Sequence, residues 1–408
     1  MLLLLPTTSY RIPDFLAAAS KLGVEVTVAS EEPSTMERLN PDGLLTLDFG
    51  DPGACAARVA EFASRRAVAA VLGVDERTAV AAAAIAERLG LPHDPVDAVA
   101  GAGNKARSRE RLASAGVASP GHRLFHVGDD PVAAAAAARY PCVLKPTFLA
   151  ASRGVIRADA PGQFVEAWRR IARILEAPEV SERGGSSARE ILVEDFVPGL
   201  EVALEGLLTG GQLRVLALFD KPDPLDGPFF EETIYVTPSR LPADIQERCA
   251  DVAAAGARAL GLRHGPIHAE MRVNESGVWI IEIAARSIGG LCSRTLRFGT
   301  GTSLEELILG HALGLEAQPA VREGSAAGVM MIPIPAGGVL EETRGVESAR
   351  AIPGIAEVTI SAHIGQRIVA LPEGDRYLGF IFSRAETPDR AEAALREAHA
   401  RLEFVIGS

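Results

Sequence analysis

The sequence predicts a multidomain chain of mixed α/β and α+β class, with a doubly wound parallel sheet in its first part and a small α+β unit at its end. Three observations support this class. The chain has 408 residues, more than one domain of about 150 residues contains. In its first part, short apolar strands alternate with helical segments, which is typical of a parallel sheet covered by helices. Its last part opens with an apolar strand and ends with a strand and a helix.

The N-terminal elements follow from apolar runs and from the residues that end them. We expect strands at Leu2–Leu5, Val24–Ala29 and Ala67–Leu72, and helices at Asp14–Leu22 and Thr78–Leu89. We place this domain at residues 1–97. Sheets of this kind bind ligands at the carboxyl ends of their strands, where polar residues stand in this sequence: Thr7, Thr8, Ser9, Asp75 and Glu76. Strand-end turns are polar in any case, so substrate contact and an ordinary turn both stay open.

The elements after residue 97 follow from the same signals. We expect helices at Lys105–Ala115, Ala133–Arg139, Ala243–Leu260 and Asp389–Leu402. The expected strands are Tyr140–Pro146, Ile191–Phe196, Glu201–Leu208, Leu213–Asp220, Gly265–Val273, Val278–Ile283, Gly328–Ile334 and Tyr377–Ser383. The segment Ala177–Arg189 has the composition of a flexible loop. We place a second domain at 98–315 and a small α+β domain at 316–408.

Composition and charge limit the classes of partner. Lys and Arg total 41 against 53 Asp and Glu, and the net charge of −12 argues against a surface that binds nucleic acid or anionic lipid nonspecifically. The widely spaced cysteines predict buried, reduced thiols rather than disulfides or a metal site. The apolar start MLLLLP is too short for a signal peptide, and no apolar run approaches the roughly 20 residues of a membrane span. We expect a cytoplasmic protein without nucleic-acid or membrane partners.

Two acidic residues stand out in neighbouring apolar strands. Glu270 and Glu282 flank the tight turn Asn274–Gly277, so an antiparallel hairpin brings them close together. Adjacent carboxylates on an apolar sheet repel each other unless a cation lies between them, and Mg²⁺ prefers carboxylate and phosphate oxygens. The alternative is a solvent-facing hairpin in which Arg272 and Arg286 pair with the two acids.

Two lysines and a small polar loop complement these acids. Lys105 follows a glycine-containing turn, and Lys145 ends an apolar strand. The loop from Thr147 to Gly154 has the composition of a segment that folds over phosphates with backbone N–H donors, although it matches no P-loop. Taken alone, either lysine fits a solvated surface residue better than a phosphate ligand. The strand Val193–Phe196 ends in acids before Pro198-Gly199, where carboxylate and backbone groups suit a purine amine and ribose hydroxyls, although an edge strand with a turn has the same pattern.

Taken in order, these segments resemble the ATP-grasp superfamily over roughly residues 1–315. The matching motifs are Asn104-Lys105 with Arg111-Leu112 and Gly116-Val117, Val143–Pro146 with Ser152–Val155, Glu194–Gly199 with Glu201, His268-Ala269-Glu270, and Ile281-Glu282-Ile283 with Arg286 and Gly289-Gly290. The final region, with Gly328–Pro335 and Tyr377–Phe382, resembles the C-terminal domain of L-amino acid ligases, the dipeptide-forming branch that is also similar to carnosine synthase.

The resemblance implies a role for each matching residue. The residues implied to bind ATP are Lys105, Lys145, Ser152, Arg153, Gly154, Glu194, Phe196, Val197, Glu201 and Lys221. Those implied to bind the substrates are Glu232, Tyr235, Arg286, Gly289 and Gly290. Glu270 and Glu282 would ligate Mg²⁺, with Mn²⁺ as the alternative, and Arg286 would meet the substrate carboxylate or its acyl phosphate. His268 or Glu232 would accept the proton of the amine, and the sequence does not choose between them. Arg294 and His311 read as surface or packing residues.

One residue and one segment depart from the family pattern. Many members have Asn where this sequence has Ala284, and the phosphate loop is poor in glycine. The leading hypothesis is an ADP-forming ligase of a small carboxylate and an amine, active as a homodimer. Two alternatives stay open. One is a different ATP-grasp reaction, such as carboxylation or a ligation in nucleotide synthesis, and the other is a nucleotide-binding regulator without catalysis.

Overall fold

The structure is a computed structural model, and it describes residues 1–34, 36, 37, 39–315 and 322–407. The N-terminal lobe is a parallel sheet in the order β3-β2-β1-β4. Its strands are β1 (Leu2–Leu4), β2 (Thr27–Ser30), β3 (Leu44–Thr46) and β4 (Val71–Gly73), and its helices are α1 (Ile12–Lys21), α2 (Pro52–Ala63) and α3 (Glu76–Leu89). Two of the expected strands begin later than predicted, β2 at Thr27 and β4 at Val71.

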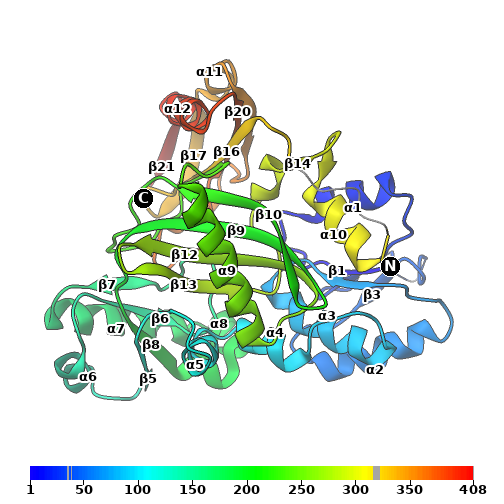
Figure 1. Cartoon of the computed structure of the whole chain (residues 1–408), viewed down its shortest axis with the longest axis horizontal. Coiled ribbons are helices and arrows are strands. Elements are labelled where there is room, and N and C mark those ends of the chain that lie inside the picture. The colour runs from blue at the N-terminus through cyan, green and yellow to red at the C-terminus, as the bar shows by residue number, and fades with distance from the viewer. Residues whose placement is uncertain (35, 38, 316–321, 408) are drawn as a thin grey trace.

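Helices cover both faces of this parallel sheet (Figure 1). Because side chains alternate along a strand, Leu3 packs with Phe15 of α1, while Leu2 and Leu4 pack with residues of α2 and α3. Helix α10 (Leu304–Ala312) returns from later in the chain to pack on α1 and β4. The doubly wound domain predicted from the sequence is therefore confirmed.

A second, antiparallel sheet has the order β5-β8-β6-β7. It consists of β5 (His122–His126), β6 (Cys142–Pro146), β7 (Ile156–Ala158) and β8 (Glu190–Asp195), with α6 (Pro131–Ala137), α7 (Pro161–Glu176), α8 (Pro178–Gly184) and the 3₁₀ helix η1 (Gly185–Arg189). The prediction of a flexible loop at 177–189 is wrong. Pro178 starts a helical turn there, and Val180 and Ala188 are buried, so apolar packing outweighs the glycine- and serine-rich composition.

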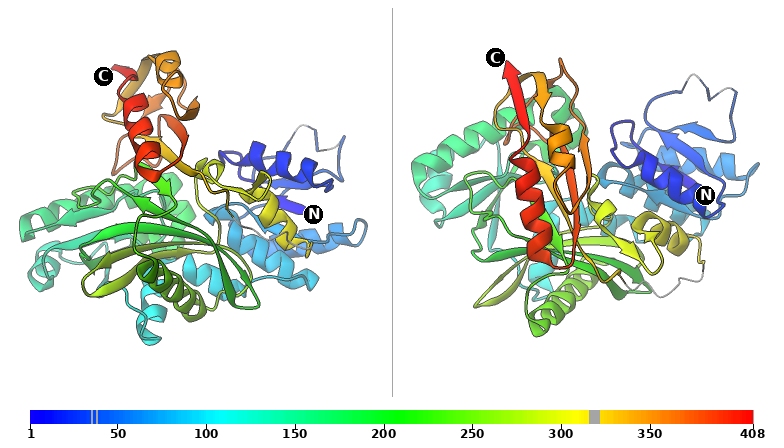
Figure 2. Two further views of the ribbon diagram at one scale, coloured as in Figure 1. Left: turned by 45° about the horizontal axis from the view of Figure 1, so that its top comes forward. Right: turned by 90° about the horizontal axis from the view of Figure 1, so that it is seen from above.

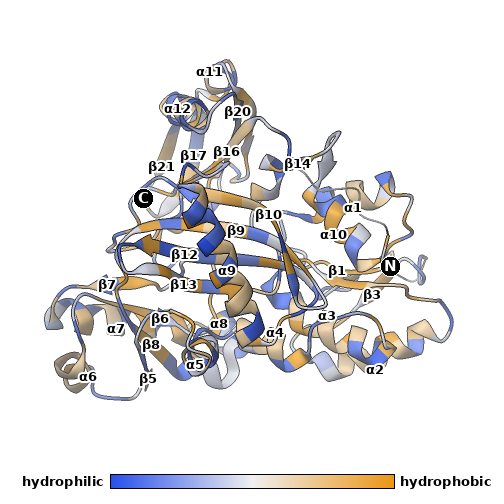
Figure 3. Cartoon of the chain, viewed as in Figure 1, coloured by the Kyte–Doolittle hydropathy of each residue, from blue (hydrophilic) through white to orange (hydrophobic). Residues whose placement is uncertain are grey.

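The central sheet has eight antiparallel strands in the order β13-β12-β9-β10-β11-β16-β20-β18. Their bounds are β9 (Leu200–Thr209), β10 (Gln212–Lys221), β11 (Ile234–Thr237), β12 (Gly265–Asn274), β13 (Gly277–Ala284), β16 (Ala326–Ile332), β18 (Ile355–Ile360) and β20 (Gly379–Ala385). The helices α4 (Val96–Ala102), α5 (Lys105–Ser114) and α9 (Ala243–Leu260) pack around one core with β9, β12 and β13. Figure 3 shows hydrophobic stretches along β1, β9 and β10, and alternating character along α9.

The C-terminal lobe continues this central sheet through β16 and β20 and adds a smaller sheet in the order β19-β17-β21. Its further elements are β17 (Gly338–Arg344), α11 (Val346–Arg350), β19 (Arg367–Ile368), α12 (Pro388–His399) and β21 (Glu403–Gly407). Between the lobes lie η2 (Cys292–Thr295), β14 (Arg297–Phe298) and β15 (Thr302–Ser303). Figure 2 shows the N-terminal lobe in blue and the C-terminal lobe in orange and red at different places on the green central sheet.

Two structural elements cross the predicted domain boundaries. Hydrogen bonds between β11 and β16 join the segments on either side of residue 315, and α4 runs across residue 97. The boundaries at 97 and 315 therefore stay a prediction about folding units. Among the described helices, none is long and apolar enough to cross a membrane.

Candidate active site

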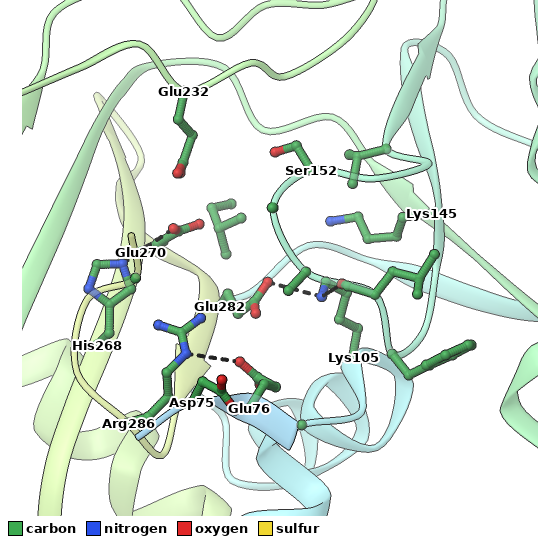
Figure 4. Close-up of a pocket in the computed structure, with 18 of the residues that line it drawn as sticks. Asp75, Glu76, Lys105, Lys145, Ser152, Glu232, His268, Glu270, Glu282 and Arg286 are labelled. Atoms are coloured by element: carbon green, nitrogen blue, oxygen red, sulfur yellow. Dashed lines mark hydrogen bonds and ion pairs between the residues drawn. The ribbon is translucent and has the colours of Figure 1, made fainter. Parts of the chain in front are cut away.

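A cavity of about 770 Å³ is lined by residues of the N-terminal lobe, of the antiparallel sheet β5-β8-β6-β7 and of the central sheet. Figure 4 shows side chains from all three pointing into it. The predicted site residues that line the cavity are Lys105, Lys145, Ser152, Glu194, Phe196, Val197, Glu201, Glu232, Tyr235, His268, Glu270, Glu282, Arg286, Gly289 and Gly290. Arg153, Gly154 and Lys221 do not line it. Arg294 pairs with Asp14 and Glu357, and His311 stacks on His264, so both lie elsewhere, as expected.

The paired glutamates lie directly opposite each other. Glu270 of β12 and Glu282 of β13 are cross-strand partners, so their side chains share one face of the sheet. Both line the cavity, and Glu282 Oε2 is 3.2 Å from Lys105 Nζ. Figure 4 shows both carboxylates directed toward the same space. The adjacent acids thus face a cavity rather than the outer surface of the protein.

The alternative pairing of these acids with nearby arginines is not found in the structure. Arg272 pairs with Glu201, and Arg286 donates from Nε to Glu76 Oε2 at 3.1 Å. Glu76 is the first residue of α3, whose N-cap Asp75 accepts the backbone N–H of Arg77. The cap that starts this helix therefore also brings Glu76 to the guanidinium across the domain interface. Of the predicted strand-end residues, Thr8, Ser9, Asp75 and Glu76 line the cavity, whereas Thr7 does not and donates to Glu31 instead.

Lys221 neutralises a cluster of three carboxylates. Its ammonium lies 2.8 Å from Glu201, 2.5 Å from Glu232 and 3.3 Å from Glu270. Oxygens of these three acids lie within 4.8 Å of one another, a spacing that suits a metal. Burial opposes the charge on Lys221, but the three acids outweigh it and raise its pKa. The buried ammonium already supplies a positive charge to this cluster.

Glu232 and His268, the two candidate proton acceptors, differ in protonation. Burial, helped by the negative Glu270 and opposed by Lys221, raises the pKa of Glu232 to about 7. Burial alone would lower the pKa of His268, but hydrogen bonds to Glu205 and Glu270 raise it to about 9. Its Nδ1 lies 2.7 Å from Glu205 and its Nε2 3.4 Å from Glu270. Near pH 7 His268 is therefore an imidazolium held between two carboxylates.

Lys145 is held by a buried ion pair. Glu194 lies 2.7 Å from Lys145 Nζ and 2.8 Å from Arg109 Nε, and all three side chains are buried. Burial favours the neutral acid, but the two cations outweigh it and lower the pKa of Glu194. The sequence reasoning missed Arg109. Its signal is a charged residue on the buried stripe of α5, between Ala106 and Leu112.

The loop of residues 147–154, which the sequence predicts to fold over phosphates, folds back on Lys105. The Lys105 N–H donates to the Thr147 carbonyl at 2.7 Å, and Lys105 Nζ donates to the Leu149 carbonyl at 2.8 Å. Gly154 has a φ of +74°, and a Cβ there would lie 2.8 Å from Pro146, so glycine is required at this position. Two other residues of the loop, Ala151 and Ser152, adopt the left-handed conformation without glycine, with φ values of +54° and +55°.

The C-terminal lobe contacts the region around β7 and α7 and contributes to the cavity wall. The Gly154 N–H donates to the Pro372 carbonyl at 2.8 Å, and Glu373 binds Arg170 of α7 through both carboxylate oxygens. A few residues on, Tyr377 lines the cavity. The sequence reasoning did not assign any of these residues to the site. Nothing in the local pattern at 370–377 reveals them, because their role depends on a contact between distant segments.

Comparison with known proteins accounts for most of the chain. A model of the ATP-grasp N-terminal domain matches residues 16–93, and a model of the ATP-grasp domain matches residues 138–295. A model of L-amino acid ligase C-terminal domain 2 matches residues 330–407. The crystal structure of an L-amino acid ligase from Bacillus licheniformis is 25% identical and covers 100% of this chain and 99% of its own, with a TM-score of 0.82.

The chain belongs to the L-amino acid ligase branch of the ATP-grasp superfamily. The predicted family and fold class are therefore confirmed. Among curated relatives, carnosine synthase 1 of Gallus gallus is 30% identical over 62% of this chain and 28% of its own length. Alanine–anticapsin ligase of Bacillus subtilis is 27% identical over 55% of this chain and 49% of its own. This L-amino acid ligase family member thus spans less than half of either relative.

Proposed function

We propose that this chain is an ATP-dependent ligase that joins a small carboxylic acid to an amine, forming an amide and, in particular, a dipeptide. The observation that carries the proposal is one cavity in which the paired glutamates face Lys105, Lys145 and Arg286. This combination suits a reaction between two anions, a nucleotide and an acid. Membership of the L-amino acid ligase branch supports the same reaction.

In the first step a carboxylate oxygen of the acid attacks the γ-phosphorus of ATP. The new O–P bond gives an acyl phosphate, and the bond from the γ-phosphorus to the bridging oxygen breaks, releasing ADP. Lys105, Lys145 and Arg286 offset the negative charge that both reactants carry. Ser152 and the rest of the phosphate loop limit access of water, which would hydrolyse the acyl phosphate.

Glu270 and Glu282 fit a divalent metal ion. They are two carboxylates on neighbouring strands at the wall of the cavity, and hard cations such as Mg²⁺ or Mn²⁺ prefer oxygen ligands of this kind. Ala284 contributes no side-chain oxygen, so these two acids are the proposed side-chain ligands. When bound, the ion would offset charge on the phosphate oxygens.

In the second step the amine attacks the acyl carbon, phosphate leaves, and the nitrogen loses a proton. We assign that proton to Glu232 rather than His268. Glu232 lines the cavity and has a pKa of about 7, so its ionised form is available at neutral pH. His268 already carries a proton there, since its pKa is about 9. Arg286, a planar donor, suits the charge that develops on the acyl oxygen.

A phosphate-release screen tests the proposal. The purified chain is incubated with Mg·ATP and pairs of L-amino acids, and productive pairs are analysed for amide by mass spectrometry. We expect phosphate release that depends on both partners, with one amide formed per phosphate. Separate arms contain bicarbonate or a ribonucleotide. Stimulation only in those arms would indicate a different ATP-grasp reaction, and ATP binding without stimulation in any arm would indicate a regulator.

A further inference from the structure

Three consecutive residues after β13 are each held by a charged side chain from a distant part of the chain. Arg286 donates from Nε to Glu76 Oε2 at 3.1 Å. Ser287 Oγ accepts from Arg11 Nη2 at 2.7 Å. The Ile288 N–H donates to Glu205 Oε1 at 2.6 Å. We call residues 286–288 the arginine loop, because it carries the guanidinium that faces the cavity in Figure 4.

Two of these anchors lie inside the protein, out of reach of water. Arg11 is 3% exposed, Ser287 2% and Glu205 0%. Arg11 is also fixed at a second point, since Nη1 donates to the Val74 carbonyl at 2.8 Å. A buried polar group that loses its partner cannot replace it with solvent. The position of the arginine loop therefore depends on these particular bonds.

Glu205 joins three segments through one oxygen. Its Oε1 accepts from the Ile288 N–H and lies 2.7 Å from His268 Nδ1. Its Oε2 is buried without a hydrogen-bond partner among the described residues. A charge in the middle of the apolar strand β9 is costly to bury, so its contacts to His268 and to the arginine loop explain why a carboxylate stands at this position.

We propose that Arg11 and Glu205 are positioning residues for Arg286. The proposal rests on the function proposed above, in which Arg286 meets the acyl phosphate. Glu205 does not line the cavity. Arg11 does, but its guanidinium is engaged by Val74, Ser287 and Glu305 of the protein itself. An electrostatic donor accelerates a reaction only while it is held where charge develops, and a misplacement of about 1 Å costs on the order of 100-fold in rate. The anchors hold Arg286 from two directions, the N-terminal lobe and β9.

Substitutions that differ only in the anchoring bond test this proposal. Ser287→Ala removes the acceptor of Arg11, and we expect kcat to fall about 10-fold while KM for ATP stays within about 2-fold. Glu205→Leu removes the acceptor of Ile288, and we expect a loss of about 100-fold or more in kcat. Glu205→Gln keeps an acceptor oxygen of the same reach, so it should restore kcat to within about 10-fold of the native enzyme.

The matched control is Ser293→Ala. Ser293 is 1% exposed, like Ser287, but its hydroxyl has no hydrogen-bond partner among the residues that the structure describes. We expect this variant to keep the native kcat. Equal losses in Ser287→Ala and Ser293→Ala, or a Glu205→Gln variant as slow as Glu205→Leu, would overturn the positioning role. Ser287→Ala and Ser293→Ala remove one hydroxyl each, so they keep the test available if Glu205→Leu does not fold.

A second readout does not depend on catalysis. In crystal structures of Ser287→Ala and Glu205→Gln we expect the Arg286–Glu76 contact to lengthen in the first and to persist in the second. An unmoved Arg286 in Ser287→Ala contradicts the proposal even if the native chain makes no amide. Absence of amide from the native chain, with Arg286 displaced as expected, would contradict only the proposed function.

Discussion

Removal of the Glu194 carboxylate should destabilise the protein strongly. In Glu194→Gln, the guanidinium of Arg109 and the ammonium of Lys145 stay buried side by side without a counter-charge. Leaving a buried charge uncompensated costs roughly 3–5 kcal/mol. Lys145 can respond by losing its proton, because burial already lowers its pKa. Arg109 is 1% exposed and keeps its charge, so the loss persists.

This cost predicts a fall in melting temperature of about 6–20 °C for a cooperative unit of roughly 150–250 residues. Differential scanning calorimetry at pH 7.5, without nucleotide, measures it. The control is Glu342→Gln, which removes one partner of an exposed ion pair with Arg344 and should leave the melting temperature unchanged. A Glu194→Gln variant that melts within 2 °C of the native protein would refute the reasoning, because the two cations would then need no counter-charge.

Three further predictions concern other groups. Glu282→Gln should lower the rate of amide formation by roughly 100- to 1000-fold and weaken nucleotide affinity much less. Phosphate release measures the rate, and calorimetric titration with Mg·ADP measures the affinity. A variant with native activity would show that Glu282 is not an essential metal ligand. Burial, helped by His264 and Arg214, lowers the pKa of His311 from 6.5 to about 4. The imidazole of His311 is therefore harder to protonate in the folded chain than in the unfolded chain. The free energy of unfolding should fall as the pH is lowered from 6.5 to 4, and His311→Gln should reduce this fall when unfolding by urea is measured across that range. Burial raises the pKa of the Cys142 thiol to about 12, and the other three cysteines are buried too. Ellman's reagent should therefore react with the native chain much more slowly than with the chain unfolded in guanidinium. Rapid labelling of the native chain would contradict this prediction.

Local pattern was sufficient for the elements with strong periodicity. The helix expected at Ala243–Leu260 is found with the same bounds, and the hairpin turn at Asn274–Gly277 joins β12 to β13 as predicted. The segment 177–189 misled the sequence reasoning because its glycines and serines suggest a loop, whereas a few buried side chains decide its structure. Composition indicates which local conformation a segment prefers, but whether its side chains are buried depends on which other segments pack against it.

The residues of the candidate site also fall into two groups, those that the sequence indicated and those that it did not. The hairpin pattern predicted that Glu270 and Glu282 lie close together, and the family resemblance added Lys105 and Lys145 to the same site; all four line one cavity. Partners such as Glu205 could not be assigned, because their contacts span long stretches of chain. A charged residue within an apolar strand or on the buried face of a helix marks such a partner, although the pattern does not say which group it binds.

The bond between Gly154 and Pro372 links the two outer parts of the fold. Gly154 ends the loop whose residues Leu149–Ser152 line the cavity, and Pro372 belongs to the lobe built around β16 and β20. A displacement of residues 147–154 away from the C-terminal lobe would break the hydrogen bond to the Pro372 carbonyl, while the ion pair of Glu373 with Arg170 would still hold that lobe to α7. The conformation of residues 147–154 therefore depends on the C-terminal lobe as well as on Lys105.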